Sequence, residues 1–160
     1  MAKSKVGVKG MFRLNIVNPD GKVVGDSKWK TNVITNVGYQ DMLMYLLAGS
    51  AGSLRPAYGA LGTSGTPNAT DSTLVNQLTE TAAKIALTTG TAGSKTVNYT
   101  WTLASGVIAA ASTITNVGIG WWTAQSQANN AGTLMAGNTY ASSSLATNQA
   151  VNATYQIIFG

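Results

Sequence analysis

The chain has 160 residues, no Cys, no His, a net charge of +5 and only 9% charged residues. This length predicts one domain with a single sizeable core. The absence of Cys and His excludes thiolate or imidazole metal sites, Ser-His and Cys-His nucleophiles, redox dithiols and histidine pH switches.

The positive charge is concentrated at the N-terminus, because residues 1–30 carry the whole net +5 and residues 31–160 sum to zero. We predict a flexible basic arm at residues 1–10 and a single β-rich domain at residues 11–160, and we expect no core residue in residues 2–9. The arm either docks on an acidic surface or nucleic acid, or is a solvated tail and edge strand whose lysines oppose aggregation. Nucleic acid is disfavoured, because no aromatic platform or recognition helix accompanies the charge.

The first predicted element is a β-hairpin. Residues 12–16 alternate apolar and polar side chains, which is typical of a half-buried strand. The Asn-Pro-Asp-Gly sequence at residues 18–21 favours a turn, since Pro presets φ and Gly accepts positive φ. The return strand begins at residues 22–24, and a further strand is expected over residues 28–34.

A helix is predicted at residues 37–48. The pair Thr35 and Asn36 offers a capping side chain, apolar residues recur at helical spacing, and Gly49 suits a C-terminal stop. We interpret the Met and Tyr residues of this segment as a stripe facing the core, in preference to a ligand-binding surface.

The next segment, residues 50–72, is rich in Gly, Ser, Thr, Ala and Pro, with a short strand expected at residues 58–62. Its glycines lack the Gly-Lys-Ser/Thr and GxGxxG contexts of phosphate-binding loops, so they indicate turns and close packing. Asp71 is predicted to cap one helical turn over residues 74–78.

The remaining predicted elements are strands. Their expected ranges are residues 80–89, 95–103, 112–123 and 133–136, and a core strand over 151–159. Residues 90–94 are expected to form the turn of a hairpin, and the glycines near Gly118 indicate a bulge or a close backbone approach. We therefore predict a mainly β fold, an antiparallel β-sandwich or jelly-roll-like barrel with one α-helix.

Residues 96–160 contain no charged side chain, although charged residues normally make up roughly a quarter of a soluble domain. We interpret this part of the chain as packed strands and partner-facing loops. The adjacent Trp121 and Trp122 point to opposite faces of an extended segment, so at most one is a core residue. The other is a partner contact, a sugar-stacking ring, or a side chain covered by the loop at residues 125–132.

The sequence predicts no enzyme. Its five carboxylates include turn and cap residues, and no two lie on elements expected to converge as a glycosidase pair does. The enzymatic alternative is an uncommon hydrolase that uses these carboxylates. We expect no catalytic residue, no metal and no cofactor.

The N-terminus lacks the apolar segment of a signal peptide, and no apolar run is long enough to span a bilayer. We therefore expect synthesis in the host cytoplasm and no membrane partner. The composition, rich in Ala, Thr, Ser, Asn and Gly, is nevertheless typical of extracellular surface assemblies. A virus particle component, assembled inside the cell and released by lysis, reconciles these two observations.

Four segments resemble small structural proteins of tailed bacteriophage virions: residues 29–38, residues 58–65 followed by 71–74, residues 114–118, and residues 132–136. The resemblance implies a non-enzymatic virion protein that decorates or cements a capsid. The alternative is a tail or fibre-base protein that binds a host glycan or protein. The expected partners are the major capsid protein or other virion proteins and further copies of the chain, with a trimer favoured. The predicted partner contacts are Lys3, Lys5, Lys9, Arg13, Trp121 and Trp122.

Overall fold

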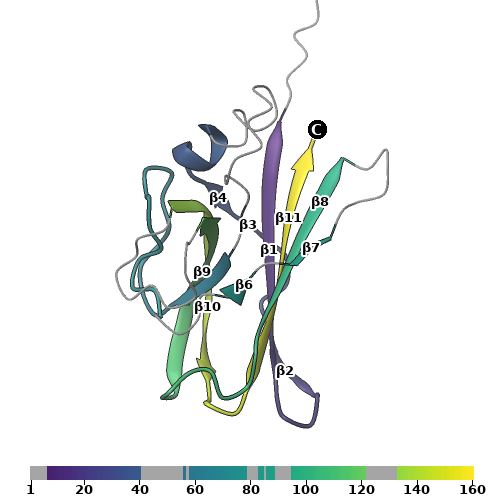
Figure 1. Ribbon diagram of the computed structural model, residues 1–160, viewed down its shortest axis with the longest axis vertical. Helices are drawn as coiled ribbons and strands as arrows, with labels where there is room; N and C mark the ends of the chain where they lie inside the picture. The colour runs from purple at the N-terminus through teal and green to yellow at the C-terminus, as the bar shows by residue number, and fades with distance from the viewer. Residues whose placement is uncertain are drawn as a thin grey trace, which may run out of the picture.

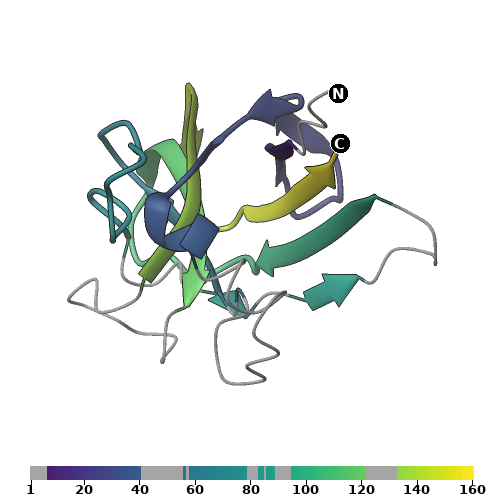
Figure 2. The ribbon, with the colours of Figure 1, turned by 90° about the horizontal axis from the view of Figure 1, so that it is seen from above.

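The computed structural model describes residues 7–40, 56, 58–78, 83–84, 86–88, 95–121 and 133–160. Two antiparallel sheets pack face to face as a β-sandwich (Figures 1 and 2), so the predicted fold class is confirmed.

We call the two sheets sheet A and sheet B. Sheet A has the order β2-β1-β11-β8-β7, and β3 also pairs with β1. Its strands are β1 (Val8–Val17), β2 (Val23–Asp26), β3 (Lys30–Thr31), β7 (Ala86–Thr88), β8 (Thr96–Leu103) and β11 (Ala150–Phe159). Sheet B has the order β4-β10-β9-β5-β6. Its strands are β4 (Val33–Ile34), β5 (Tyr58–Gly62), β6 (Ala83–Lys84), β9 (Ser112–Trp121) and β10 (Thr133–Leu145).

The core lies between the two sheets. The period-two alternation of β1 and β11 puts one apolar row of each strand on the inner face of sheet A. Tyr155 is fully buried, and its ring centroid lies 4.5 Å from that of Phe12. Buried side chains from both sheets form one cluster that includes Phe12, Leu14, Trp101, Leu103, Tyr155, Ile157, Leu61, Ile114, Val117, Ile119 and Met135.

The first and last strands pair side by side over ten residues, from Val8 opposite Phe159 to Val17 opposite Ala150. Gly7 and Gly160 exchange two backbone hydrogen bonds beyond this register. The sheet therefore begins before the predicted arm boundary at residue 10. Of residues 2–9, the structure describes 7–9, where Val8 is half-buried and packs against the core without belonging to it. Residues 1–6 lie outside the described residues.

The first hairpin is confirmed. The backbone N–H of Gly21 donates to the carbonyl of Asn18 at 2.9 Å, and Gly21 adopts the positive φ that the turn requires. The Oδ1 atom of Asp20 accepts the N–H of Lys22 at 2.9 Å.

Two predicted strands each contain two short strands that belong to different sheets. Residues 28–34 contain β3, which pairs with β1 in sheet A, and β4, which pairs with β10 in sheet B. Residues 80–89 contain β6 in sheet B and β7 in sheet A. At the first crossing, the side chain of Asn32 donates to the carbonyl of Val33 and the hydroxyl of Tyr155. These segments connect the two sheets at both edges of the sandwich.

The helix begins at Asn36 and continues to residue 40, the last described residue of this stretch. Thr35, one of the two residues predicted to cap this helix, does so: its Oγ1 atom accepts the N–H of Gly38 at 3.0 Å. The rest of the predicted helix, residues 41–48, lies outside the described residues.

The loop at residues 63–78 covers the face of sheet B that points away from sheet A (Figures 1 and 2). Leu74 is fully buried there and packs with Ala60 and Leu134. Asn116, a buried side chain of β9, donates through Nδ2 to the carbonyl of Ser64 at 2.7 Å and to that of Val75 at 3.2 Å. Sheet B is therefore covered on both faces.

The helical turn predicted after Asp71 is wrong. Asp71 closes a turn toward earlier residues instead, since its Oδ2 atom accepts the N–H of Asn68 at 2.7 Å and its own N–H donates to the carbonyl of Asn68. Gln77 then forms an isolated bridge with Gly62 of β5. Residues 74–78 thus follow the sheet as a loop.

The predicted short strand at residues 133–136 is the start of a longer strand, β10, which continues to Leu145. Its later residues are mostly small or polar, and their burial does not alternate: Ala141, Ser142 and Ser144 are exposed, whereas Leu145 is fully buried. Two register shifts against β9 interrupt the pairing further. The expected bulge near Gly118 is found on the partner strand, between Leu134 and Ala136.

Candidate functional site

The predicted contact residues do not form one site in the described part of the chain. Lys9 is exposed and Arg13 is half-buried, four residues apart on the outer face of β1. Trp121 ends β9, where its backbone pairs with Thr133 of β10. Lys3, Lys5 and Trp122 lie outside the described residues, and their predicted contacts stay predictions.

Arg13 forms an ion pair within the protein. Its Nε and Nη2 atoms donate to the two carboxylate oxygens of Asp26 at 3.1 and 3.0 Å. The Nζ atom of Lys28 donates to Asp26 Oδ2 at 2.8 Å. The planar, two-pronged geometry fixes the guanidinium in place. This ion pair joins β1 to β2, and the predicted partner contact of Arg13 stays a prediction.

Asp26 also shapes the chain after β2. Its Oδ1 atom accepts the N–H of Lys28 at 2.9 Å, which stabilises a left-handed conformation at Lys28 with φ of 59°. Ser27 adds a second connection, because its Oγ atom accepts the N–H of Leu14 at 2.9 Å. The turn at residues 26–29 is thus tied to β1 by the side chains of Asp26, which binds Arg13, and Ser27, which binds Leu14.

We expect Asp26→Asn to remove a pH-dependent part of the stability. Hydrogen bonds from Arg13 and then from Lys28 hold the pKa of the Asp26 carboxyl well below its usual range. A lowered folded-state pKa stabilises the fold above the unfolded value of about 3.9, and this stabilisation is lost as the pH falls further. Urea midpoints should therefore be higher for the wild type at neutral pH, and the difference from Asp26→Asn should shrink below about pH 4.

The matched control is Asp20→Asn, since an amide oxygen at that position still accepts the N–H of Lys22. Its urea midpoint should follow that of the wild type at every pH. A difference between wild type and Asp26→Asn that stays constant down to the acid range would contradict the assigned role of the carboxylate.

The structure exposes a group of apolar side chains that the sequence analysis did not single out. Six large apolar side chains are exposed in the described part of the chain, and four of them lie within residues 23–33. They are Val23 (51% exposed), Val24 (48%), Trp29 (37%) and Val33 (36%). The available signal was Trp29 itself, a large aromatic residue between two lysines in the sequence Asp-Ser-Lys-Trp-Lys at residues 26–30.

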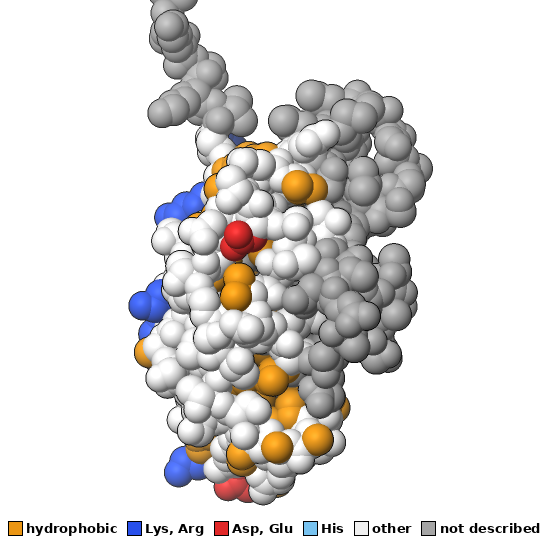
Figure 3. Space-filling model, turned by 90° about the vertical axis from the view of Figure 1, so that its left-hand side faces the viewer, with side chains coloured by type: hydrophobic (Ala, Val, Ile, Leu, Met, Phe, Trp, Pro, Cys, Tyr) orange, Lys and Arg blue, Asp and Glu red, His pale blue; other side chains and the backbone are white. Residues whose placement is uncertain are grey.

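The outer face of sheet A is polar with few charges. Its central strands, β11 and β8, pair Asn152 with Thr102, Thr154 with Thr100, and Gln156 with Asn98. Thr102 donates to Asn152 Oδ1 at 2.9 Å, so part of this face is bonded internally. The side of the molecule on the left of Figure 1 is also mostly uncharged, with Lys and Arg side chains along one of its edges (Figure 3).

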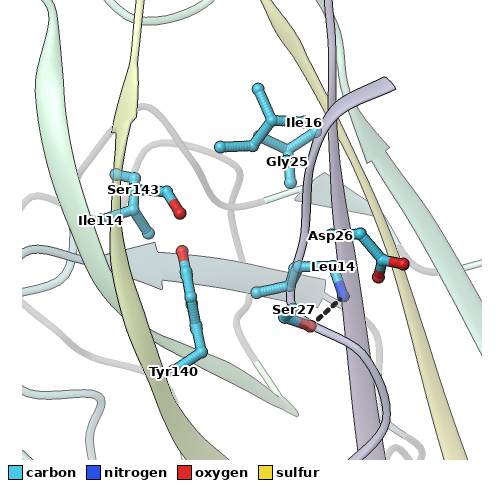
Figure 4. A pocket seen from close by; sticks show the side chains of 9 residues that line it. Leu14, Ile16, Gly25, Asp26, Ser27, Ile114, Tyr140 and Ser143 are labelled. Atoms are coloured by element: carbon cyan, nitrogen blue, oxygen red, sulfur yellow. Dashed lines mark hydrogen bonds between the residues drawn. The ribbon is translucent and has the colours of Figure 1, made fainter. Parts of the chain in front are cut away.

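One small pocket lies between the two sheets in the described part of the chain. Its volume is about 10 Å³, and it lies between β1 and β2 on one side and β9 and β10 on the other (Figure 4). The ring of Tyr140 points into it beside Ser143 and Ile114 (Figure 4). This volume suits about one water molecule, whereas small-molecule sites occupy roughly 300–1,000 Å³. The pocket is therefore no substrate site.

Within the described ranges, no three His, Cys, Asp or Glu side chains gather as metal ligands would. Nor does any helix among the described residues have the length and apolar character needed to cross a membrane. Comparison of the chain with family models, with curated proteins and with solved structures returned no match.

Proposed function

We propose that this chain is a non-enzymatic structural protein of a bacteriophage virion, which decorates or cements the capsid through contacts with shell proteins and with further copies of itself. The observation that carries the proposal is the absence of charged side chains from residues 96–160. These residues supply β8, β9, β10 and β11, which are all of the long strands except β1. Broad neutral surfaces favour association with other proteins over a monomer in solution.

The virion context rests on the resemblance of the four segments noted in the sequence. In the fold, most of their described residues lie in or on sheet B. Residues 58–62 of β5 pair with residues 116–120 of β9, which overlap the segment 114–118, and residues 133–136 pair with β9 and β4. Leu74 packs on the same sheet, whereas residues 30–31 pair with β1 in sheet A. The clustering of three of the four segments on sheet B supports a shared fold as the source of the resemblance.

The test of this proposal is the copy number of the protein in purified particles, measured by quantitative mass spectrometry against the major capsid protein. A capsid-coating protein should be present in numbers comparable to the shell subunits. A much smaller number would favour the tail or fibre-base alternative, with Trp121 and Trp122 at the contact. Absence of the protein from intact particles would contradict both.

Self-association is part of the proposal, with a trimer favoured. Neutral faces associate without the charge repulsion that keeps monomers apart. Sedimentation equilibrium of the purified protein should give a mass of about three chains, and added salt should change it little, because few charges meet across such faces. A monomer in solution that also sediments as a monomer from dissociated particles would contradict the proposed oligomeric contacts.

A further inference from the structure

The strands β2 and β3 form one interrupted edge strand along β1. Val23 lies opposite Val17 and Asp26 opposite Asn15, and beyond the turn at residues 27–29, Lys30 lies opposite Phe12. We call residues 22–31 the β2–β3 edge. At roughly 3.3 Å per residue it is at most about 30 Å long, which suits one side of an ordinary protein interface.

The β2–β3 edge combines exposed apolar groups with cations. Val23, Val24 and Trp29 are among its most exposed apolar side chains. Lys22, Lys28 and Lys30 are exposed beside them. Asp26, the one carboxylate within residues 22–31, binds Arg13 and Lys28, and Asp20, in the turn before the edge, accepts the N–H of Lys22. The edge therefore offers positive charge and no free carboxylate to a partner.

The position of Trp29 is fixed before any partner binds. The bonds from Lys28 to Asp26 and from Leu14 to Ser27 hold the turn that precedes it, and the pairing of Lys30 with Phe12 fixes the chain that follows it. Trp is the residue most enriched among side chains that dominate interface energies. Ordering a contact residue in advance also lowers the entropy lost on binding.

We propose that the β2–β3 edge, with Trp29 as its anchor, is the surface by which this chain docks on an acidic face of a different protein. The inference rests on the proposed function, which makes that protein a component of the virion shell. The complementary face carries carboxylates opposite Lys22 and Lys30 around an apolar recess for the Trp29 ring.

A second copy of this chain fits the edge poorly. The whole chain has five acidic side chains, of which Asp26 lies on the edge itself and Asp20 in the turn before it, and residues 96–160 have none. Nucleic acid also fits poorly, because single strands bind through several stacked aromatic rings and the edge offers Trp29 beside two valines. Charge complementarity therefore favours an acidic partner protein.

The experiment is co-sedimentation with particles from a host strain in which the gene for this chain is deleted. Trp29→Ser should weaken binding about tenfold or more. Lys30→Glu should weaken it several-fold at low salt, and this effect should fade as exposed charges are screened. The first control is Val107→Ser, which changes a similarly exposed apolar residue between β8 and β9. The second control is Lys95→Glu, which changes a cation next to β8, a strand separated from the β2–β3 edge by β1 and β11. Both should bind within about twofold of the wild type. Unchanged thermal unfolding should accompany all four variants.

The outcomes separate this inference from the proposed function. If the wild type does not bind the particles, the proposed function fails and the inference with it. If the wild type binds and the edge variants bind equally well, the function stands, the inference is overturned, and the lysines serve only to guard an edge strand. A truncation of residues 2–6 that alone abolishes binding would assign docking to the arm. Loss of oligodeoxythymidine binding in Trp29→Ser would make the edge a nucleic-acid surface and overturn the protein partner.

Discussion

Above about pH 10 the free energy of unfolding should fall steeply, because Tyr155 is buried in its neutral form. Burial raises the pKa of the Tyr155 hydroxyl far above its ordinary value, and the hydrogen bond from Asn32 at 3.3 Å opposes this only in part. A raised folded-state pKa leaves stability intact below the unfolded value of about 10 and removes it as the pH rises further. The slope for one such tyrosine is about 1.4 kcal/mol per pH unit.

Tyr140 adds to the same effect, since burial also raises the pKa of its hydroxyl. Urea unfolding at intervals from about pH 9 to pH 11, with tyrosinate absorbance recorded in parallel, measures both the slope and the protons released. The matched variant is Tyr155→Phe, which keeps the ring that packs 4.5 Å from Phe12 and removes the ionisable group. The pH dependence of its free energy of unfolding should be smaller by the contribution of one ionising group, about 1.4 kcal/mol per pH unit. Equal slopes in wild type and variant would contradict the assignment to Tyr155.

The strands that alternate strictly were predictable from the sequence. The predicted strands at residues 95–103 and 151–159 agree with β8 and β11 to within one residue at each end. Each strand has one face on the core and one face outward, so apolar and polar residues alternate along its sequence. The β1–β2 turn was predictable for a different reason, because Asn-Pro-Asp-Gly determines its own backbone conformation.

Elements that depend on distant contacts were not predictable. The switch between β3 and β4 is set by which strand each half meets, β1 or β10, and both halves are extended. The loop at residues 63–78 is buried because sheet B lies beneath it, which composition alone does not indicate. In β9, residues 116–120 are buried on both faces, so the alternation disappears there.

The candidate surface was predictable only in its charge. Lys9 and Arg13 were expected contacts, but the bond between Arg13 and Asp26 joins residues 13 positions apart and depends on the hairpin register. The exposure of Trp29 depends on the turn that Asp26 stabilises. A sequence pattern identifies a tryptophan readily, but whether its ring faces solvent or core is decided by the strand break beside it.

Asn116→Asp should destabilise the protein more than its small change in size suggests. Asn116 is fully buried, and its Nδ2 atom donates to the carbonyls of Ser64, Val75 and Gly65 at 2.7, 3.2 and 3.3 Å. The substitution places a carboxylate oxygen against these carbonyl oxygens, with no cation among these contacts to compensate. We expect a loss of about 3 kcal/mol or more at neutral pH, because a charged group is then buried without a partner.

The same argument gives the pH dependence of the variant. Burial raises the pKa of the introduced carboxyl above the unfolded value of about 3.9, so its destabilising effect should shrink as the pH falls toward that value and the group becomes neutral in both states. Asn116→Ala removes the donor without adding charge and should cost about 1–3 kcal/mol, with no such recovery in acid.

Asn152→Asp is the matched control, since it makes the same chemical change at an exposed residue of β11. Its free energy of unfolding should stay within about 0.5 kcal/mol of the wild type. Hydrogen exchange should show which part of the fold opens first in the Asn116 variants. Protection should be lost first at Leu78 and Leu134, whose N–H groups bond to Leu61 and to Ser72 at the contact between the loop and sheet B. If Asn116→Asp proves as stable as Asn152→Asp, the Asn116 amide does not hold the loop at residues 63–78 on the sheet.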